Sequence, residues 1–167
     1  MKQYSKLRNA QSASVILLLL MFTLRIGATD ETKVSYPADY RSWQHVKTMV
    51  IQPGHPLEDP FGGIHHVYAN PLAMHGLEAG RYVDGAIFVF DLLDYTVSDN
   101  ILAEQDRKRI DVMHFDRSQY VNTGGWGYET FVGDSATERL DQDVAVACHA
   151  CHTSARGTNF VFSQYRR

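Results

Sequence analysis

The sequence predicts a mainly β domain of the α+β class: an antiparallel β-sheet with a few short helices and a last helix near the C-terminus. Four or five segments are rich in strand-forming residues and are separated by turn-forming residues. Few of the connections are long enough for the crossovers that parallel strands require. Helical patterns are few and fall mainly at the edges, which favours an antiparallel sheet over alternating strands and helices.

The first half of the chain starts with a polar segment, 29–36, and a helical turn that begins at Pro37. The segment 45–52 has strand-forming residues and predicts the first strand. It ends at 53–63, where three prolines and three glycines in eleven residues predict a loop. The segment 64–69 then predicts the second strand.

Residues 70–80, NPLAMHGLEAG, predict the clearest helix of the chain. Asn70 is suited to the N-cap, Pro71 to the first helical position and Gly80 to the C-terminal end. The expected apolar face of this helix consists of Leu72, Ala73 and Leu77.

Three more strands follow, at 85–97, 109–116 and 126–132. The first of them is apolar on both faces at its start, so we expect it in the centre of the sheet. A polar loop and the pair Gly124-Gly125 separate the other two. Asp134 or Ser135 is expected to cap a helix that leads to the cysteines.

The N-terminus has the pattern of a signal peptide. Basic residues come first, an apolar run covers 13–24, and Ala28 precedes the expected cleavage point. We therefore expect residues 1–28 to be a signal peptide for export and 29–167 to form a single domain. An uncleaved anchor is the alternative, although the run is shorter than the about 20 residues of a membrane span.

The charge of the expected mature chain bears on its partners. Four of the 16 basic residues and none of the 19 acidic ones lie in the first 28 positions. The remaining 12 basic residues against 19 acidic ones give a net charge of -7. An acidic chain repels phosphate backbones, so we expect no nucleic acid as partner.

Both cysteines lie near the C-terminus, in the sequence Cys148-His149-Ala150-Cys151-His152. C-x-x-C-H is the attachment signal for a c-type haem. Two thiols at this spacing on a helical turn reach the two vinyl groups of a porphyrin, and the histidine after the second thiol binds the iron. We therefore expect one covalent haem c, with Cys148 and Cys151 as attachment sites and His152 as iron ligand. His149 is expected to be a solvent-side spacer.

Other uses of the cysteine pair are less consistent with the sequence. A redox dithiol usually accompanies a β-α-β pattern, which is missing. A structural zinc site requires four ligands, and there is no second cysteine pair. A disulfide between the two cysteines leaves His152 unexplained.

The order of the motif and the strands bears on function. Small electron-carrier cytochromes are usually helical, with the motif near the N-terminus, whereas here it follows a β-rich domain. A histidine or methionine as sixth iron ligand makes an electron carrier, and an open sixth position makes a site for small ligands. The candidates for a sixth ligand are His65, His66 and Met113.

From Tyr36 to its end, the chain resembles the cytochrome P-460 and cytochrome c-prime-beta family. The resemblance rests on YPADYRSW, GIHHVYANPLA, GAIFVFDLLD, TGGWGYETF, and CHACH followed by FVFSQYR. It implies a periplasmic antiparallel-sheet protein, commonly a homodimer, with one covalently held haem and an open or capped distal face. One branch oxidises hydroxylamine and has a lysine cross-linked to the porphyrin. The other binds nitric oxide and similar diatomics under a cap of aromatic side chains.

The resemblance also implies which branch the chain is closer to. The cross-linking lysine of the hydroxylamine oxidisers is expected at the start of VDGAIFVFDLLD, where this chain has Gly85. After residue 28 only Lys33, Lys47 and Lys108 remain, and none lies in that segment. Lys47 is a remote substitute and is more simply read as an edge or surface lysine. The ligand-binding branch is therefore favoured.

The distal acid of the family falls in RIDVMHFD, at or near Asp111 or Met113, which share one face of the expected strand. A carboxylate in an apolar pocket has a raised pKa and can transfer protons. Whether Asp111 faces the haem or points outward stays open at this point. His65 and His66 are neighbours on a strand and are expected to face opposite ways.

Aromatic residues of the later strands are candidates for the core. Phe88 and Phe90 share one face of their strand, opposite to Gly85. If the face that bears Gly85 looks at the haem, these two are expected in the core and the distal cap comes from elsewhere. Trp126 and Tyr128 are expected to pack in the sheet core or against the haem edge.

The sequence therefore predicts a periplasmic monohaem c-type cytochrome that binds a small nitrogen species such as nitric oxide. The expected partners are that ligand, a redox partner protein and a second copy of the chain. A hydroxylamine-oxidising enzyme and a six-coordinate electron-transfer cytochrome are the alternatives, so enzymatic activity stays open.

Overall fold

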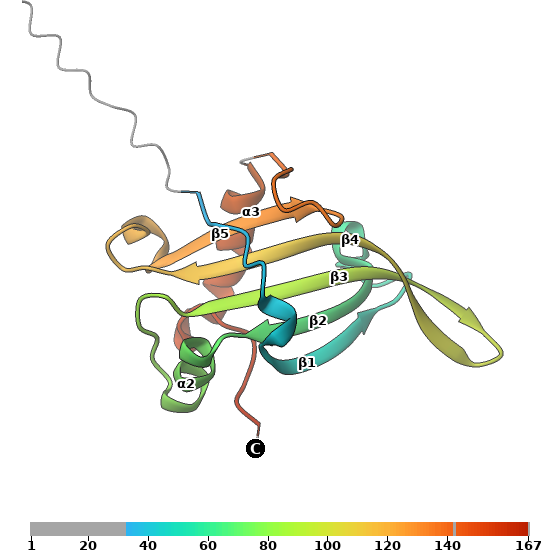
Figure 1. Ribbon diagram of the computed structural model, residues 1–167, viewed down its shortest axis with the longest axis horizontal. Helices are drawn as coiled ribbons and strands as arrows, with labels where there is room; N and C mark the ends of the chain where they lie inside the picture. Colours follow the sequence, from blue (N-terminus) through green and yellow to red (C-terminus); the bar gives the residue numbers. More distant parts are fainter. Residues whose placement is uncertain (1–32, 142, 167) are drawn as a thin grey trace, which may run out of the picture.

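The computed structural model describes residues 33–141 and 143–166, so the expected signal peptide lies outside the described residues. One antiparallel sheet of five strands follows the order of the chain, each strand beside the next (Figure 1). The strands are β1 Gln44–Ile51, β2 Gly63–Ala69, β3 Ile87–Ser98, β4 Ile101–Phe115 and β5 Trp126–Val132. β3 lies in the centre, as its apolar start predicts.

Short helices complete the fold and confirm the predicted class. They are α1 Glu58–Phe61, α2 Pro71–Ala79 and α3 Asp143–His152, with 3-10 turns at Tyr40–Ser42, Val121–Thr123 and Thr153–Thr158. Among the described residues, no helix is long and apolar enough to cross a membrane. The fold is thus a mainly β, α+β domain whose last α-helix carries both cysteines.

One face of the sheet, which we call the α3 face, packs against α3 and the residues after it. Residues directly opposite each other on antiparallel strands share a face. The buried side chains of this cluster include Val67, Phe88, Phe115, Trp126 and Tyr128. Cys148 of α3 and Phe160 pack against them. In Figure 1, α3 lies behind β4 and β5.

The other face, which we call the N-terminal face, packs against the first described segment. Val34 and Tyr40 of that segment close a second cluster over this face. The strand residues of the cluster are Val89, Ile110, Val112 and Phe131. In Figure 1 the N-terminal segment crosses the front of the sheet, so the two faces are covered by opposite ends of the chain.

Helix α2 begins and ends where the sequence predicts. The side chain of Asn70 accepts a hydrogen bond from the backbone N–H of Ala73 at 2.9 Å, as an N-cap does. Gly80 follows the helix in the left-handed conformation, with φ 70°. The predicted apolar face is wrong at one position: Leu72 is 43 % exposed, whereas Ala73 and Gly76 are buried.

Strands β3 and β4 form a hairpin that extends beyond the other strands (Figure 1). β4 begins at Ile101 instead of the predicted 109. Asp99 and Asn100 adopt left-handed φ angles of 51° and 63° and make a two-residue turn. Residues 101–106 are all exposed, so they carry no alternation of apolar and polar residues that would mark them as a strand.

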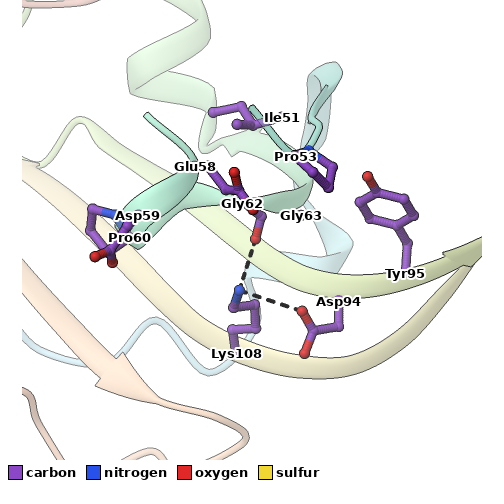
Figure 2. Close-up of a pocket in the computed structure, with 10 residues that line it drawn as sticks. All are labelled: Ile51, Pro53, Glu58, Asp59, Pro60, Gly62, Gly63, Asp94, Tyr95 and Lys108. Carbon is purple, nitrogen blue, oxygen red and sulfur yellow. Dashed lines mark hydrogen bonds and ion pairs between the residues drawn. The ribbon is translucent and has the colours of Figure 1, made fainter. Parts of the chain in front are cut away.

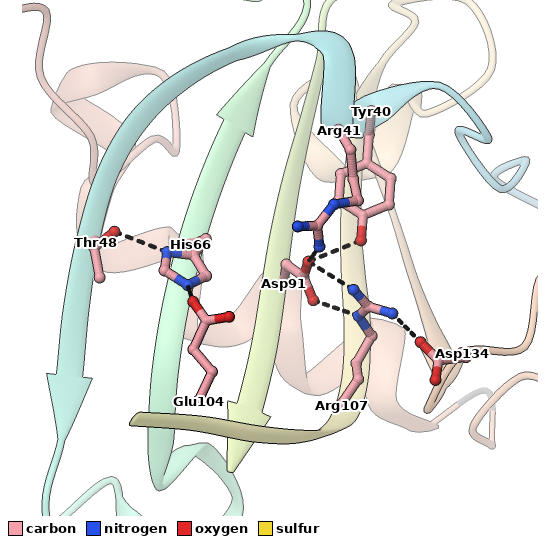
Figure 3. Close-up of polar contacts among 8 residues, drawn as sticks. All are labelled: Tyr40, Arg41, Thr48, His66, Asp91, Glu104, Arg107 and Asp134. Carbon is pink, nitrogen blue, oxygen red and sulfur yellow. Dashed lines mark hydrogen bonds and ion pairs between the residues drawn. The ribbon is translucent and has the colours of Figure 1, made fainter. Parts of the chain in front are cut away.

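Two charged clusters tie this hairpin to the N-terminal face (Figure 3). The fully buried carboxylate of Asp91 accepts hydrogen bonds from the Tyr40 hydroxyl at 2.8 Å and from Arg107 Nε at 2.6 Å. Nearer to the hairpin turn, Glu104 of β4 pairs with Nε2 of His66. His66 belongs to β2, on the far side of β3, so the hairpin curls back across this face of the sheet.

The prediction that a helix starts at Asp134 or Ser135 is wrong, because α3 begins at Asp143. The hydroxyl of Ser135 instead accepts a hydrogen bond from the backbone N–H of Glu138 at 2.8 Å, within a turn. The backbone N–H of Leu140 then donates to the carbonyl of Thr130 at 3.0 Å. This segment therefore runs along the edge of β5 before the helix starts.

Candidate functional site

Helix α3 brings the three residues of the C-x-x-C-H motif to one place. Cys148 and Cys151 are free thiols rather than a disulfide, and His152 ends the helix. Cys148 is half-buried against the α3 face, whereas Cys151 is exposed. Burial, followed by the carboxylate of Asp111, raises the pKa of the Cys148 thiol to about 12. This thiol is therefore neutral at physiological pH.

A backbone carbonyl orients the imidazole of His152. Its Nδ1 lies 2.6 Å from the carbonyl oxygen of Phe160. A carbonyl only accepts, so Nδ1 donates and Nε2 presents its lone pair. No described residue is hydrogen-bonded to this Nε2. Burial lowers the pKa of His152, which favours the neutral ring. Metal-binding histidines commonly have this arrangement.

Tyr128 of β5 lies against this end of α3. Its ring centroid is 5.3 Å from that of His152 and 5.8 Å from that of His149. The prediction that His149 is a solvent-side spacer is wrong, because its ring contacts both Tyr128 and Phe160. The Tyr128 hydroxyl and His149 Nδ1 are buried without a hydrogen-bond partner in the described part of the chain.

Asp111 lies on the α3 face, so its side chain does not point outward. It is directly opposite Phe90 of β3 and Thr130 of β5. The Thr130 hydroxyl donates to Oδ1 at 2.6 Å, and Arg109 Nε donates to Oδ2 at 3.1 Å. Burial raises the pKa of Asp111, and the Arg109 and Thr130 contacts oppose that shift. Both carboxylate oxygens therefore have a partner.

Met113 shares the α3 face with Asp111, as the alternation of the strand predicts. It is directly opposite Phe88 on β3 and Tyr128 on β5, and it packs against the same cluster. Phe90 packs against this cluster as well. Apolar side chains of β3, β4 and β5 thus surround the carboxylate near Cys148.

His65 and His66 face opposite ways, as predicted. His66 lies on the N-terminal face, with Nδ1 2.8 Å from the Thr48 hydroxyl and Nε2 paired with Glu104 (Figure 3). His65 lies on the α3 face and is fully buried, and its Nε2 donates to the carbonyl of Phe61 at 2.5 Å. Burial lowers the pKa of His65 to about 4, despite the Phe61 carbonyl. Only His65 of this pair is on the same side as α3.

The two positions relevant to a lysine cross-link lie apart in the fold. Lys47 is on the edge strand β1, opposite Val67, and therefore on the α3 face. It is partly buried, and this burial lowers the pKa of its amine. Gly85 precedes β3 with φ 90°, and a Cβ there would lie 3.2 Å from the Leu72 side chain.

A cavity of about 620 Å³ lies between α1, the loop around it and the base of the β3–β4 hairpin (Figure 2). Lys108 lines this cavity. Its Nζ donates to the carbonyl of Gly62 at 2.9 Å and pairs with Asp94 at 3.4 Å. None of the residues that line it belongs to α3 or has a thiol or imidazole side chain. This cavity is therefore separate from the motif.

The surroundings of α3 fit a haem. None of the residues of this mostly apolar helix is buried, and Val146 and Phe162 are 67 % and 52 % exposed. A porphyrin joined to Cys148 and Cys151 would cover apolar surface of this kind. The free lone pair of His152 Nε2 suits an iron, and the unpaired polar atoms of Tyr128 and His149 indicate that a further group completes the site.

The antiparallel sheet and the C-x-x-C-H helix define a haem-binding, and hence iron-binding, cytochrome. A family model of Cytochrome P460 matches residues 37–163. The chain therefore belongs to the cytochrome P460 family, which confirms the resemblance drawn from the sequence. A comparison with curated proteins found no match.

Several groups at the site were not singled out from the sequence. Arg109 and Thr130 hold the carboxylate of Asp111, and the alternation of their strands was a usable signal because it places all three on one face. The carbonyl of Phe160 carries no signal, since every residue has a backbone carbonyl. Its role depends on the path of the chain after α3.

Proposed function

We propose that this chain is a monohaem c-type cytochrome of the ligand-binding kind. Cys148 and Cys151 hold the haem through thioether bonds, and His152 binds the iron on one side. The sixth position stays open to a small nitrogen species such as nitric oxide. When attached to the two cysteines, the haem would supply an iron that takes small ligands and changes oxidation state.

The observation that carries this proposal is the state of His152. Its Nδ1–H is donated to the Phe160 carbonyl at 2.6 Å, which leaves the Nε2 lone pair for a metal. Both thiols are free and lie on the same helix. Two free thiols and an imidazole with an available lone pair, the groups that a c-type haem requires, therefore lie next to each other.

The side chains that are candidates for a sixth ligand are engaged in other contacts. His66 lies on the opposite face of the sheet, with both ring nitrogens bonded. Met113 packs in the core. His65 uses Nε2 for a backbone carbonyl, and its buried Nδ1 has no hydrogen-bond partner among the described residues. The contacts of His66 and Met113 support an open sixth position, and His65 Nδ1 is the nitrogen through which a six-coordinate electron carrier would have to form.

The lining of the α3 face suits a small neutral ligand. Phe88, Phe90 and Met113 provide apolar contacts on this face, and apolar surroundings favour uncharged diatomics over ions. Asp111 is the proposed polar group beside the ligand; it can transfer a proton to a protonatable ligand such as hydroxylamine, whereas nitric oxide has no proton to exchange. Its carboxylate is buried and hydrogen-bonded, which fixes its position.

Mass spectrometry of the haem-loaded protein tests the attachment. We expect a haem that stays bound after denaturation of the wild type, and attachment through a single thioether, or none, in Cys148→Ser and in Cys151→Ser. Cys148→Ser and Cys151→Ser each serve as the control for the other. A doubly linked haem in either variant would contradict the assignment of the thioether sites.

Hydroxylamine oxidation is the second candidate function, and the position of Lys47 is the observation that favours it. The amine lies on the α3 face and is partly buried. A mass spectrum that shows a haem-bearing peptide containing Lys47 would support this function. Peptides with haem at the cysteines alone would support the ligand-binding proposal.

The resemblance to the family carries the remaining proposals. These are a periplasmic location after removal of residues 1–28, a homodimer, and a redox partner protein. Sequencing of the mature N-terminus and sedimentation of the purified protein test the first two. Reduction of the haem by candidate periplasmic proteins tests the third.

A further inference from the structure

We infer that Trp126 is the positioning residue for His152: its indole N–H holds the segment whose carbonyl orients the imidazole. This inference rests on the proposed function, because it assigns His152 to the iron. It concerns how strongly His152 binds the iron rather than whether it does so.

The carbonyl that accepts the His152 proton belongs to an unusual piece of backbone. Asn159 and Phe160 have φ angles of 55° and 66°, so two successive residues with side chains adopt the left-handed conformation. Residues other than glycine rarely adopt it, and the surrounding structure has to hold them there. The backbone N–H of Phe160 also turns back to the carbonyl of Ala155 at 2.8 Å.

Besides this backbone bond, three further contacts hold the segment in place. The indole N–H of Trp126 donates to the carbonyl of Asn159 at 2.9 Å, and the amide side chain of Asn159 donates to the carbonyl of Gly80 at 2.8 Å. Gly124 makes room for the ring of Phe160, because a Cβ at Gly124 would lie 2.4 Å from that ring. Of these contacts, the indole bond is the one made by a fully buried side chain.

Trp126 is itself rigidly placed. Its ring is fully buried and lies 4.9 Å from the ring of Phe115, 5.0 Å from that of Tyr82 and 6.0 Å from that of Phe88. It begins β5, so the sheet fixes its backbone. The hydrogen bond from Trp126 therefore fixes the loop after α3 relative to the sheet.

The consequence concerns the bond between imidazole and iron. A histidine that donates its second N–H to a well-placed carbonyl is fixed in one tautomer and becomes a stronger ligand. Loss of the indole donor leaves the peptide between Asn159 and Phe160 held only through its N–H, by the bond to the Ala155 carbonyl, and thereby loosens the backbone at Phe160. The carbonyl of Phe160 then moves out of line, and His152 becomes a weaker and less uniformly oriented ligand.

Resonance Raman spectroscopy of the reduced haem protein tests this, because the iron–histidine stretching frequency reports the strength of that bond. In Trp126→Phe, which keeps an aromatic ring and removes the N–H, we expect a lower and broader band than in the wild type. Tyr82→Phe is the control: it alters the ring next to Trp126 and leaves the indole bond intact, so its band should stay at the wild-type frequency. An unchanged band in Trp126→Phe would overturn the inference.

A second pair of variants gives an answer if Trp126→Phe does not fold. Asn159 is exposed, and Asn159→Ala and Asn159→Gly both remove its side-chain bond. Only the alanine variant also resists a φ of 55°. We expect a lower band in Asn159→Ala and a smaller change in Asn159→Gly. Equal bands in both variants and the wild type would overturn the inference.

A readout without haem completes the test. Nitrogen-15 NMR of the His152 ring in the haem-free protein reports which nitrogen carries the proton. The wild type should be protonated at Nδ1, and Trp126→Phe should be a mixture of tautomers. Failure of the proposed function is distinguishable from this result, because it appears in the wild type as a haem without bound His152. Failure of the inference appears only as identical behaviour of the wild type and Trp126→Phe.

Discussion

Arg107 binds the buried carboxylate of Asp91 with two nitrogens, Nε to Oδ1 at 2.6 Å and Nη2 to Oδ2 at 3.2 Å (Figure 3). The Tyr40 hydroxyl reaches the same carboxylate, so one side chain joins β3, β4 and the N-terminal segment. This cluster lies on the face of the sheet opposite to α3. We expect it to determine stability rather than haem chemistry.

Replacement of Asp91 by asparagine should destabilise the protein by about 3 kcal/mol, because it removes the fully buried carboxylate that Arg107 binds with two nitrogens and leaves that partly buried guanidinium with the exposed Asp134 as its charge partner. Urea unfolding of the wild type and Asp91→Asn measures this. Asp99→Asn is the matched control, since Asp99 is exposed in the hairpin turn and asparagine tolerates its left-handed φ. Equal losses in the two variants would contradict a special role for Asp91.

His65 should make the protein less stable as the pH falls. Burial lowers its pKa from 6.5 to about 4, so between these values the unfolded chain binds a proton that the folded chain does not. The loss between pH 7 and pH 5 should be about 2 kcal/mol.

Urea unfolding at a series of pH values checks this. His65→Gln should have a shallower dependence of stability on pH than the wild type. His75→Gln should retain the wild-type slope, because His75 is exposed on α2. The account of His65 would fail if both variants retained that slope.

Asp111→Asn should raise the midpoint potential of the haem by something on the order of tens of millivolts, because a negative charge near the attachment site is removed. Redox titration measures the potential. Glu104→Gln removes the same charge on the opposite face and should have little effect. A potential that does not move in Asp111→Asn would place the carboxylate too far from the iron to act on a ligand.

Lys47→Ala should leave the mass of the haem and its absorption spectrum unchanged if the chain belongs to the ligand-binding branch. The amine lies on the edge strand and is only partly buried, so its removal should cost little stability. Loss of a red-shifted absorption band in this variant would instead identify Lys47 as a cross-linking residue.

The sequence was most informative where local chemistry decides the structure. The ends of α2 follow from the Asn70 cap and the left-handed Gly80, and β2 and β5 follow from short runs of strand-forming residues. The alternation of β4 correctly placed Asp111 and Met113 on one face. It could not decide which face of the sheet would receive α3, because that depends on packing between distant parts of the chain.

The predictions failed where the structure of a segment depends on a neighbouring segment and not on its own sequence pattern. The hairpin arm at 101–106 is exposed, so nothing in its sequence separates it from a loop. The segment from Asp134 has a capping pattern, yet its backbone pairs with the edge of β5. His149 looked like a spacer because the motif does not specify it, whereas the ring packs against Tyr128.

The absorption spectrum of the reduced, haem-loaded protein, recorded before and after addition of nitric oxide, shows whether the sixth position of the iron is open. We expect a high-spin, five-coordinate spectrum that changes at once with the gas, because we propose His152 as the single axial ligand from the residues that the structure describes. A sharp low-spin spectrum that does not respond to nitric oxide would contradict it and indicate a second strong axial ligand. A strongly red-shifted Soret band before any gas is added would also contradict it, in favour of a cross-linked, hydroxylamine-oxidising enzyme.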